Sequence, residues 1–161
     1  MPDTTARPQQ FPNTTRRPAR IAASATRAPE KRTPDGKIAV LFPLADLEPE
    51  QWDRPKLIMF PDGSVRRLSY WNDLIIQTAL YLWETERLTL DSLPVKRNGS
   101  RHIANRTGIH SNGRHFVNPK WLSGNLFAVE TNVDRYTSVK CAIELLVHCA
   151  IDPSDVHVEM R

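Results

Sequence analysis

The feature that most constrains this chain is a β-hairpin pattern that leads directly into an amphipathic helix pattern. Residues 56–60 and 65–68 are two short runs rich in apolar side chains, and a Pro-Asp-Gly-Ser sequence at 61–64 separates them. In such a turn, proline presets φ, the aspartate side chain bonds to its own backbone, and glycine accepts a positive φ. The sequence therefore predicts two antiparallel strands joined by a tight turn.

Two amphipathic helices are predicted from apolar residues that recur at steps of three and four. The first should begin at an N-cap on Ser69 and run to about Arg87. Its predicted inner face consists of Trp71, Leu74, Ile75, Thr78, Ala79, Leu82 and Trp83. The second should begin after an N-cap on Asp134 and end before Asp152-Pro153. Its predicted inner face consists of Tyr136, Val139, Ile143, Leu146, Val147 and Ala150.

The remaining apolar runs predict short strands. Residues 38–42 indicate an edge strand, residues 104–107 and 125–131 indicate strands between the two helices, and residues 156–160 indicate a C-terminal strand. The order is β-hairpin, amphipathic helix, further short strands, second amphipathic helix and C-terminal strand, which is typical of an α+β fold. With 161 residues, 40% of them hydrophobic, the chain is expected to form a single α+β domain over residues 38–161.

Residues 1–37 have a different composition and are predicted to be a disordered basic tail. They are rich in proline, arginine and threonine, and they hold eight Lys or Arg against three Asp or Glu, a net charge of +5. Such a composition cannot bury enough apolar surface to offset the entropy lost on ordering. Since the whole chain is +4, residues 38–161 carry −1. The overall basic charge therefore cannot by itself show that the folded part binds nucleic acid.

A local charge pattern is more informative. Residues 92–129 contain no Asp or Glu but six Lys or Arg, and the turn sequences at 98–100 and 111–113 place these cations on exposed loops. Basic loops with nearby aromatic side chains are typical of surfaces that bind nucleic acid. The predicted nucleic-acid-binding residues are Lys96, Arg97, Arg101, His102, Arg106, Arg114, His115, Lys120 and Trp121.

Other partners account for the same charge pattern. The basic loops could contact an acidic protein, or they could balance the acidic segments at 46–53 and 152–159 within the fold or across a homodimer. A protein–protein adaptor or self-association module would instead use the apolar edge at 38–42. Steep weakening of binding by salt would favour the electrostatic interface over the apolar one.

No metal, cofactor or catalytic motif is recognised, so a binding role is favoured over an enzymatic one. His102, His110 and His115 are eight and five residues apart, which is not the four-residue spacing of a helical metal-binding pair. Glu130 and Asp134 form the only pair of acids considered for a nuclease, and they are interpreted as a strand end and a helix cap. No metal ligand, catalytic residue or cofactor is therefore predicted.

The cysteines and the hydropathy of the chain bear on its compartment. Cys141 and Cys149 lie eight residues apart on one predicted helix, about 12 Å along its axis, so they cannot bridge and should be free thiols. Free thiols are typical of a reducing compartment. The chain has no uncharged apolar stretch long enough to cross a membrane, and its start lacks the order of a secretory signal. No membrane partner and a cytoplasmic location are expected.

Several short sequence motifs within residues 56–160 resemble those of a known bacterial domain. They are Phe60-Pro61-Asp62-Gly63-Ser64, Ser69-Tyr70-Trp71-Asn72-Asp73-Leu74, Asn118-Pro119-Lys120, Gly124-Asn125-Leu126 and Val129-Glu130-Thr131-Asn132. In these phrases the chain resembles a small, poorly characterised bacterial domain associated with restriction and defence proteins. The shared phrases are turns, caps and core positions, so the resemblance implies one fold unit and carries over no catalytic residue.

Overall fold

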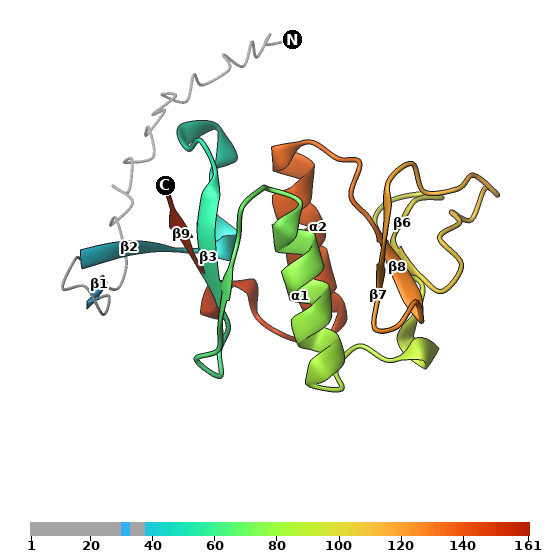
Figure 1. The fold of residues 1–161 in the computed structure, drawn as a ribbon, viewed down its shortest axis with the longest axis horizontal. Coiled ribbons are helices and arrows are strands. Elements are labelled where there is room, and N and C mark those ends of the chain that lie inside the picture. The colour runs from blue at the N-terminus through green and yellow to red at the C-terminus, as the bar shows by residue number, and fades with distance from the viewer. Residues whose placement is uncertain (1–29, 33–37) are drawn as a thin grey trace, which may run out of the picture.

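The computed structural model describes residues 30–32 and 38–161, and Figure 1 shows two helices lying between two β-sheets. The first sheet has the strand order β1-β2-β9-β3-β4 and the second has the order β5-β6-β8-β7. Every strand pair in both sheets is antiparallel. The predicted α+β class is confirmed.

The first sheet contains the predicted hairpin and the predicted C-terminal strand. Strands β3 (Pro55–Met59) and β4 (Val65–Arg67) pair, and β9 (His157–Met160) lies in the middle of the sheet. The turn forms as the sequence predicts, because Phe60 N–H donates to Ser64 C=O at 2.9 Å and Ser64 N–H donates to the Asp62 carboxylate at 2.9 Å. Gly63 supplies the positive φ of +83° that this turn requires.

The apolar run at 38–42 forms a strand with neighbours on both sides. β2 (Ile38–Pro43) lies between β1 (Glu30–Arg32) and β9, so the prediction of an edge strand is wrong for this run. Single 3₁₀ turns follow at Leu44–Asp46 and Pro49–Gln51. Apart from β1, the predicted disordered tail of residues 1–37 lies outside the described residues.

Helix α1 (Asp73–Glu84) is shorter than predicted at its N-terminus. Asn72, not Ser69, is the N-cap. The Asp73 carboxylate accepts the backbone N–H groups of Ser69 and Tyr70 at 2.8 and 3.0 Å, which holds the preceding residues in a turn outside the helix. The Trp71 indole N–H donates to the Asp53 C=O at 3.0 Å and fixes that turn against the loop that precedes β3.

Helix α2 (Arg135–His148) begins where predicted but buries a different face. The Asp134 carboxylate accepts the Thr137 N–H at 2.7 Å, which confirms the predicted N-cap. Tyr136 and Val147, predicted to be buried, are 49% and 60% exposed. The buried residues are Thr137, Ser138, Val139, Cys141, Ala142, Leu145 and Leu146. α2 packs against α1 and also lies between the two sheets, so it is covered on more than one side. Its buried face is therefore broad and includes small polar residues.

The second sheet is built from strands that are only partly visible in the sequence. It contains β5 (Val95–Lys96), β6 (His102–Asn105), β7 (Pro119–Leu122) and β8 (Phe127–Glu130). β6 and β8 overlap the predicted strands at 104–107 and 125–131. β5 and β7 were not predicted, because β5 has only two residues and β7, with the sequence Pro-Lys-Trp-Leu, shows no alternating apolar pattern. A 3₁₀ turn at Leu90–Ser92 connects α1 to this sheet.

One contiguous hydrophobic cluster contains core residues from both sheets and both helices. Ile58 comes from the first sheet, Phe60 from the position that follows β3, Leu82 from α1, Leu145 from α2 and Phe127 from the second sheet, and all are at most 1% exposed. The shared core fixes the second sheet against the helices. The loops at the far end of that sheet therefore start from rigid positions.

Candidate functional site

Two tight turns of the second sheet are joined side by side. In the first turn, Arg97 N–H donates to Arg101 C=O at 3.0 Å, which closes the β5–β6 hairpin. In the second turn, His110 N–H donates to Arg114 C=O at 2.8 Å. Ser111 N–H then donates to Ser100 C=O at 3.0 Å and connects the two turns. Both turns lie where the sequence predicts them, and Gly99 and Gly113 adopt positive φ in them.

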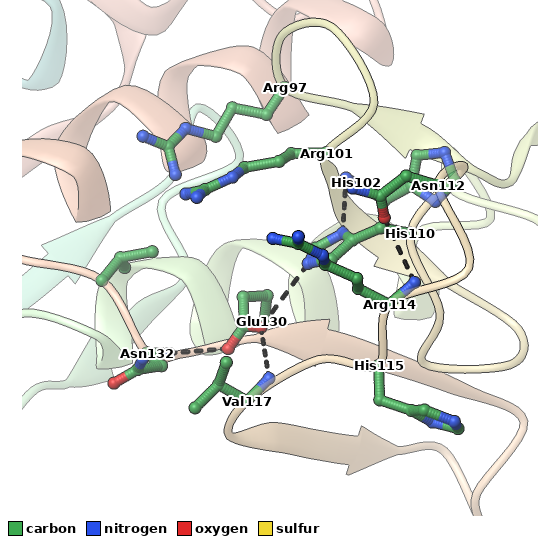
Figure 2. Close-up of a pocket in the computed structure, with 11 residues that line it drawn as sticks. Arg97, Arg101, His102, His110, Asn112, Arg114, His115, Val117, Glu130 and Asn132 are labelled. Carbon is green, nitrogen blue, oxygen red and sulfur yellow. Dashed lines mark hydrogen bonds and ion pairs between the residues drawn. The ribbon is translucent and has the colours of Figure 1, made fainter.

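The joined turns form one side of a cleft of about 190 Å³. The end of β8 and the residues that follow it form the other side, including Glu130 and Asn132. Figure 2 shows Arg97 and Arg101 directed to the same side of the cleft, with His110 and the Arg114 side chain between them and Glu130. The fold thus brings together cations that are up to 17 positions apart in the sequence.

The arginines of the cleft differ in how much compensating charge lies near them, since Arg97 interacts electrostatically with Asp134 and Glu144. Arg101 and Arg114 are exposed, and neither forms an ion pair with any residue that the structure describes. Arg97 is half-buried, and its guanidinium donates to the Thr137 hydroxyl at 3.4 Å. Guanidinium groups held near each other without carboxylate partners attract an anion with several acceptor oxygens.

Glu130 lines the same cleft as these arginines, and backbone N–H groups hold its carboxylate firmly. Its Oε2 accepts the Val117 N–H at 2.7 Å, and its Oε1 accepts the N–H groups of Asn118 and Asn132 at 3.2 and 2.8 Å. The carboxylate therefore fastens the loop before β7 to the end of β8. The interpretation of Glu130 as a strand-end residue is supported, and Asp134 is the helix cap.

His110 is oriented by the backbone of the neighbouring strand. The His102 N–H donates to His110 Nδ1 at 3.0 Å, so Nδ1 is an acceptor and the neutral ring carries its proton on Nε2. His110 Nε2 lies 3.9 Å from Glu130 Oε2. Burial lowers the pKa of His110 more than the nearby Glu130 charge raises it, so the ring is neutral at physiological pH.

His102, predicted to contact nucleic acid, is engaged within its own loop. Its ring is buried, with Nε2 2.8 Å from the Ser111 hydroxyl and Nδ1 3.1 Å from the Ile109 C=O. The Asn105 amide donates to the same carbonyl at 2.6 Å. These bonds hold the loop at 109–111 on β6, which positions the second turn.

The other predicted site residues are divided between the cleft and other surfaces. His115 lines the cleft, but Figure 2 shows its ring directed away from the arginines. Arg106 donates to the Leu90 C=O at 3.0 Å and pairs with Asp91 at 3.1 Å. Lys96 lies exposed on β5, and Lys120 lies exposed on β7. Trp121 is 40% exposed, and its ring lies over Gly108, where φ is +65°.

Six cleft residues were not among the predicted site residues: His110, Asn112, Val117, Glu130, Asn132 and Val133. His110 lies within the acid-free segment at 92–129 but lacks the spacing of a metal ligand, and Glu130 lies one residue beyond that segment. The sequence feature that could have identified Glu130 is its position, since it is the first acid after that segment and ends a buried strand. The pairing of β6 with β8, together with the bond from the His102 N–H to His110 Nδ1, brings the two residues together.

Within residues 30–32 and 38–161, no three His, Cys, Asp or Glu side chains are grouped so that they could hold a metal ion. No helix in this described part of the chain is both long and apolar enough to cross a membrane. Cys141 and Cys149 are free, as predicted, and burial raises the pKa of Cys141 to about 12.

Comparisons with protein-family models, curated proteins and solved structures find no match to this chain. The resemblance to a domain associated with restriction and defence therefore stays a prediction.

Proposed function

We propose that the cleft between the joined turns and the end of β8 binds the phosphate groups of a nucleic acid, as a binding module without chemistry of its own. The observation that carries the proposal is the convergence of Arg97, Arg101 and Arg114 on one cleft. Arginine presents a planar set of donors that matches the oxygens of a phosphate. A cleft with three such groups suits a repeating phosphate chain.

Binding is favoured over catalysis because His110, the imidazole of the cleft, is already engaged as an acceptor. His110 Nδ1 accepts a backbone N–H, and Glu130 accepts three. A general base needs an available lone pair aimed at the proton that it removes. Neither ring nitrogen of His110 offers one in the neutral form, since its second nitrogen carries the proton.

The self-association alternative loses support from the position of β2. The apolar run at 38–42, which an adaptor would present as a free edge, lies between β1 and β9. An acidic protein would bind to the same arginines as a nucleic acid, so the same variants test that alternative. The free thiols are compatible with the expected cytoplasmic location, where nucleic acids are accessible.

The test is a salt series of binding to fluorescently labelled single-stranded RNA and DNA, read by anisotropy. Replacing Arg101 and Arg114 by alanine should weaken binding by about tenfold for each arginine, as expected for lost charge-assisted hydrogen bonds. The slope of log K against log salt should fall by about 0.7 for each phosphate contact removed.

A matched control removes the same charge elsewhere. Arg67 on β4 and Arg87 after α1 are exposed and lie outside the cleft. The R67A/R87A variant should bind almost as wild type does. Equal losses in the two double variants would show that net charge, not the cleft, drives binding, and no binding of either nucleic acid by wild type would refute the proposed function.

A further inference from the structure

The wall of the cleft presents one hydrogen-bond donor beside one acceptor. His110 must offer an N–H at Nε2, because the His102 backbone N–H occupies Nδ1. Among the described residues, this N–H has no acceptor at hydrogen-bonding distance, since Glu130 Oε2 lies 3.9 Å away. The His110 side chain keeps 11% exposure and lines the cleft, so a ligand can reach the group.

Glu130 keeps an acceptor position on the same side. A carboxylate offers about four lone-pair sites, two on each oxygen. Oε1 already accepts two backbone N–H groups, whereas Oε2 accepts one, from Val117. Oε2 therefore retains a site, and it is the oxygen that lies nearest to His110 Nε2.

The spacing of these two atoms selects for a hydroxyl group. One oxygen placed about 2.8 Å from both atoms would accept from His110 and donate to Glu130, a normal length for both bonds. A phosphate or carbonyl oxygen cannot donate to the carboxylate, and an ammonium cannot accept from the imidazole. Only a group that is both donor and acceptor satisfies the two atoms together.

We propose that this pair binds the ribose 2′-hydroxyl, so that the cleft recognises RNA in preference to DNA. This inference rests on the proposed function, since it requires Arg97, Arg101 and Arg114 to hold the adjacent phosphates. The 2′-hydroxyl is the group that distinguishes RNA from DNA, and it is both donor and acceptor. It lies next to the phosphate chain, as the His110–Glu130 pair lies next to the arginines in Figure 2.

The first experiment leaves the protein unchanged and alters the ligand. Wild type is titrated with one sequence as single-stranded RNA, as DNA and as 2′-fluoro RNA, which keeps an RNA-like sugar shape but has no 2′ donor. RNA should bind about tenfold more tightly than DNA, as expected for bonds to a charged and a neutral group. The 2′-fluoro strand should bind like DNA; if it binds like RNA, sugar shape and not the hydroxyl is recognised, and the inference is wrong.

The second experiment alters the protein and uses the ratio of RNA to DNA affinity as its readout. His110→Phe keeps an aromatic ring against Phe116, whose ring centroid lies 4.7 Å away, but removes the Nε2 donor together with the Nδ1 acceptor of the His102 N–H. The ratio should fall towards one. His148→Phe, at the exposed end of α2, makes the same substitution away from the cleft and should keep the wild-type ratio.

The outcomes separate this inference from the proposed function. Salt-sensitive binding of RNA and DNA with equal affinity would overturn the hydroxyl assignment and leave phosphate binding standing. An RNA preference that survives in H110F would also overturn it. Absence of binding to every strand would refute the proposed function itself.

Discussion

Replacing Glu130 by alanine tests whether this carboxylate holds the cleft together. The change removes the acceptor for three backbone N–H groups, those of Val117, Asn118 and Asn132. These groups belong to two segments, the loop before β7 and the residue pair after β8. Without the carboxylate, the loop loses these three bonds and keeps the two that Thr131 donates to the Asn118 C=O, at 3.1 and 2.7 Å.

The magnitude follows from the number of bonds and their exposure. A hydrogen bond to a charged group contributes about 1.5–3 kcal/mol when it is well buried. The Glu130 side chain keeps 11% exposure, so water can reach some of the released N–H groups. We therefore expect about 1 kcal/mol for each bond, or a loss of about 3 kcal/mol in the free energy of unfolding. For a chain of this size that corresponds to a fall of about 10 °C in Tm.

Urea denaturation followed by tryptophan fluorescence measures the loss, with differential scanning calorimetry for Tm. Glu130→Gln keeps one acceptor oxygen and should lie between alanine and wild type. Glu50→Ala removes an exposed acid from a 3₁₀ turn and should change stability by less than about 0.5 kcal/mol. If E130A is as stable as E50A, the carboxylate does not fasten the loop, and the description of the cleft wall is wrong.

Two further predictions concern α2. Leu145→Ala should lower the free energy of unfolding by about 3 kcal/mol because Leu145 is fully buried, whereas Val147→Ala should change it by less than about 0.5 kcal/mol because Val147 is 60% exposed. If urea denaturation shows the same loss in the free energy of unfolding for both variants, the buried face of α2 includes Val147, as predicted from the sequence. Asp134→Ala should cost about 1 kcal/mol at pH 7 through loss of the N-cap. The Thr137 N–H lowers the pKa of Asp134 in the folded state, so this stabilisation is complete above the unfolded pKa and disappears as pH falls through the folded pKa. The stability difference between D134A and wild type should therefore shrink below about pH 4, and a difference independent of pH would contradict the cap.

The sequence by itself determined the features that depend on neighbouring residues. The hairpin turn at 61–64 and the N-cap at Asp134 were both predictable because every bond that forms them lies within four residues. The same reasoning identified the turns at 98–100 and 111–113 and the absence of acids from 92–129. These features indicated a basic surface on loops, without showing which cations share a site.

The tertiary structure decided which residues meet. α2 buries Ser138 and Ala142 and exposes Tyr136 and Val147, because the positions of α1 and the sheets, not helical periodicity, choose the inner face. Likewise, the bond between Ser111 and Ser100 brings Arg114 to Arg97 and Arg101, while Asp91 pairs with Arg106 outside the cleft. His110 and Glu130, 20 positions apart, face each other through the pairing of β6 with β8. Contacts of this kind depend on strand register and layer order, which no short stretch of sequence encodes.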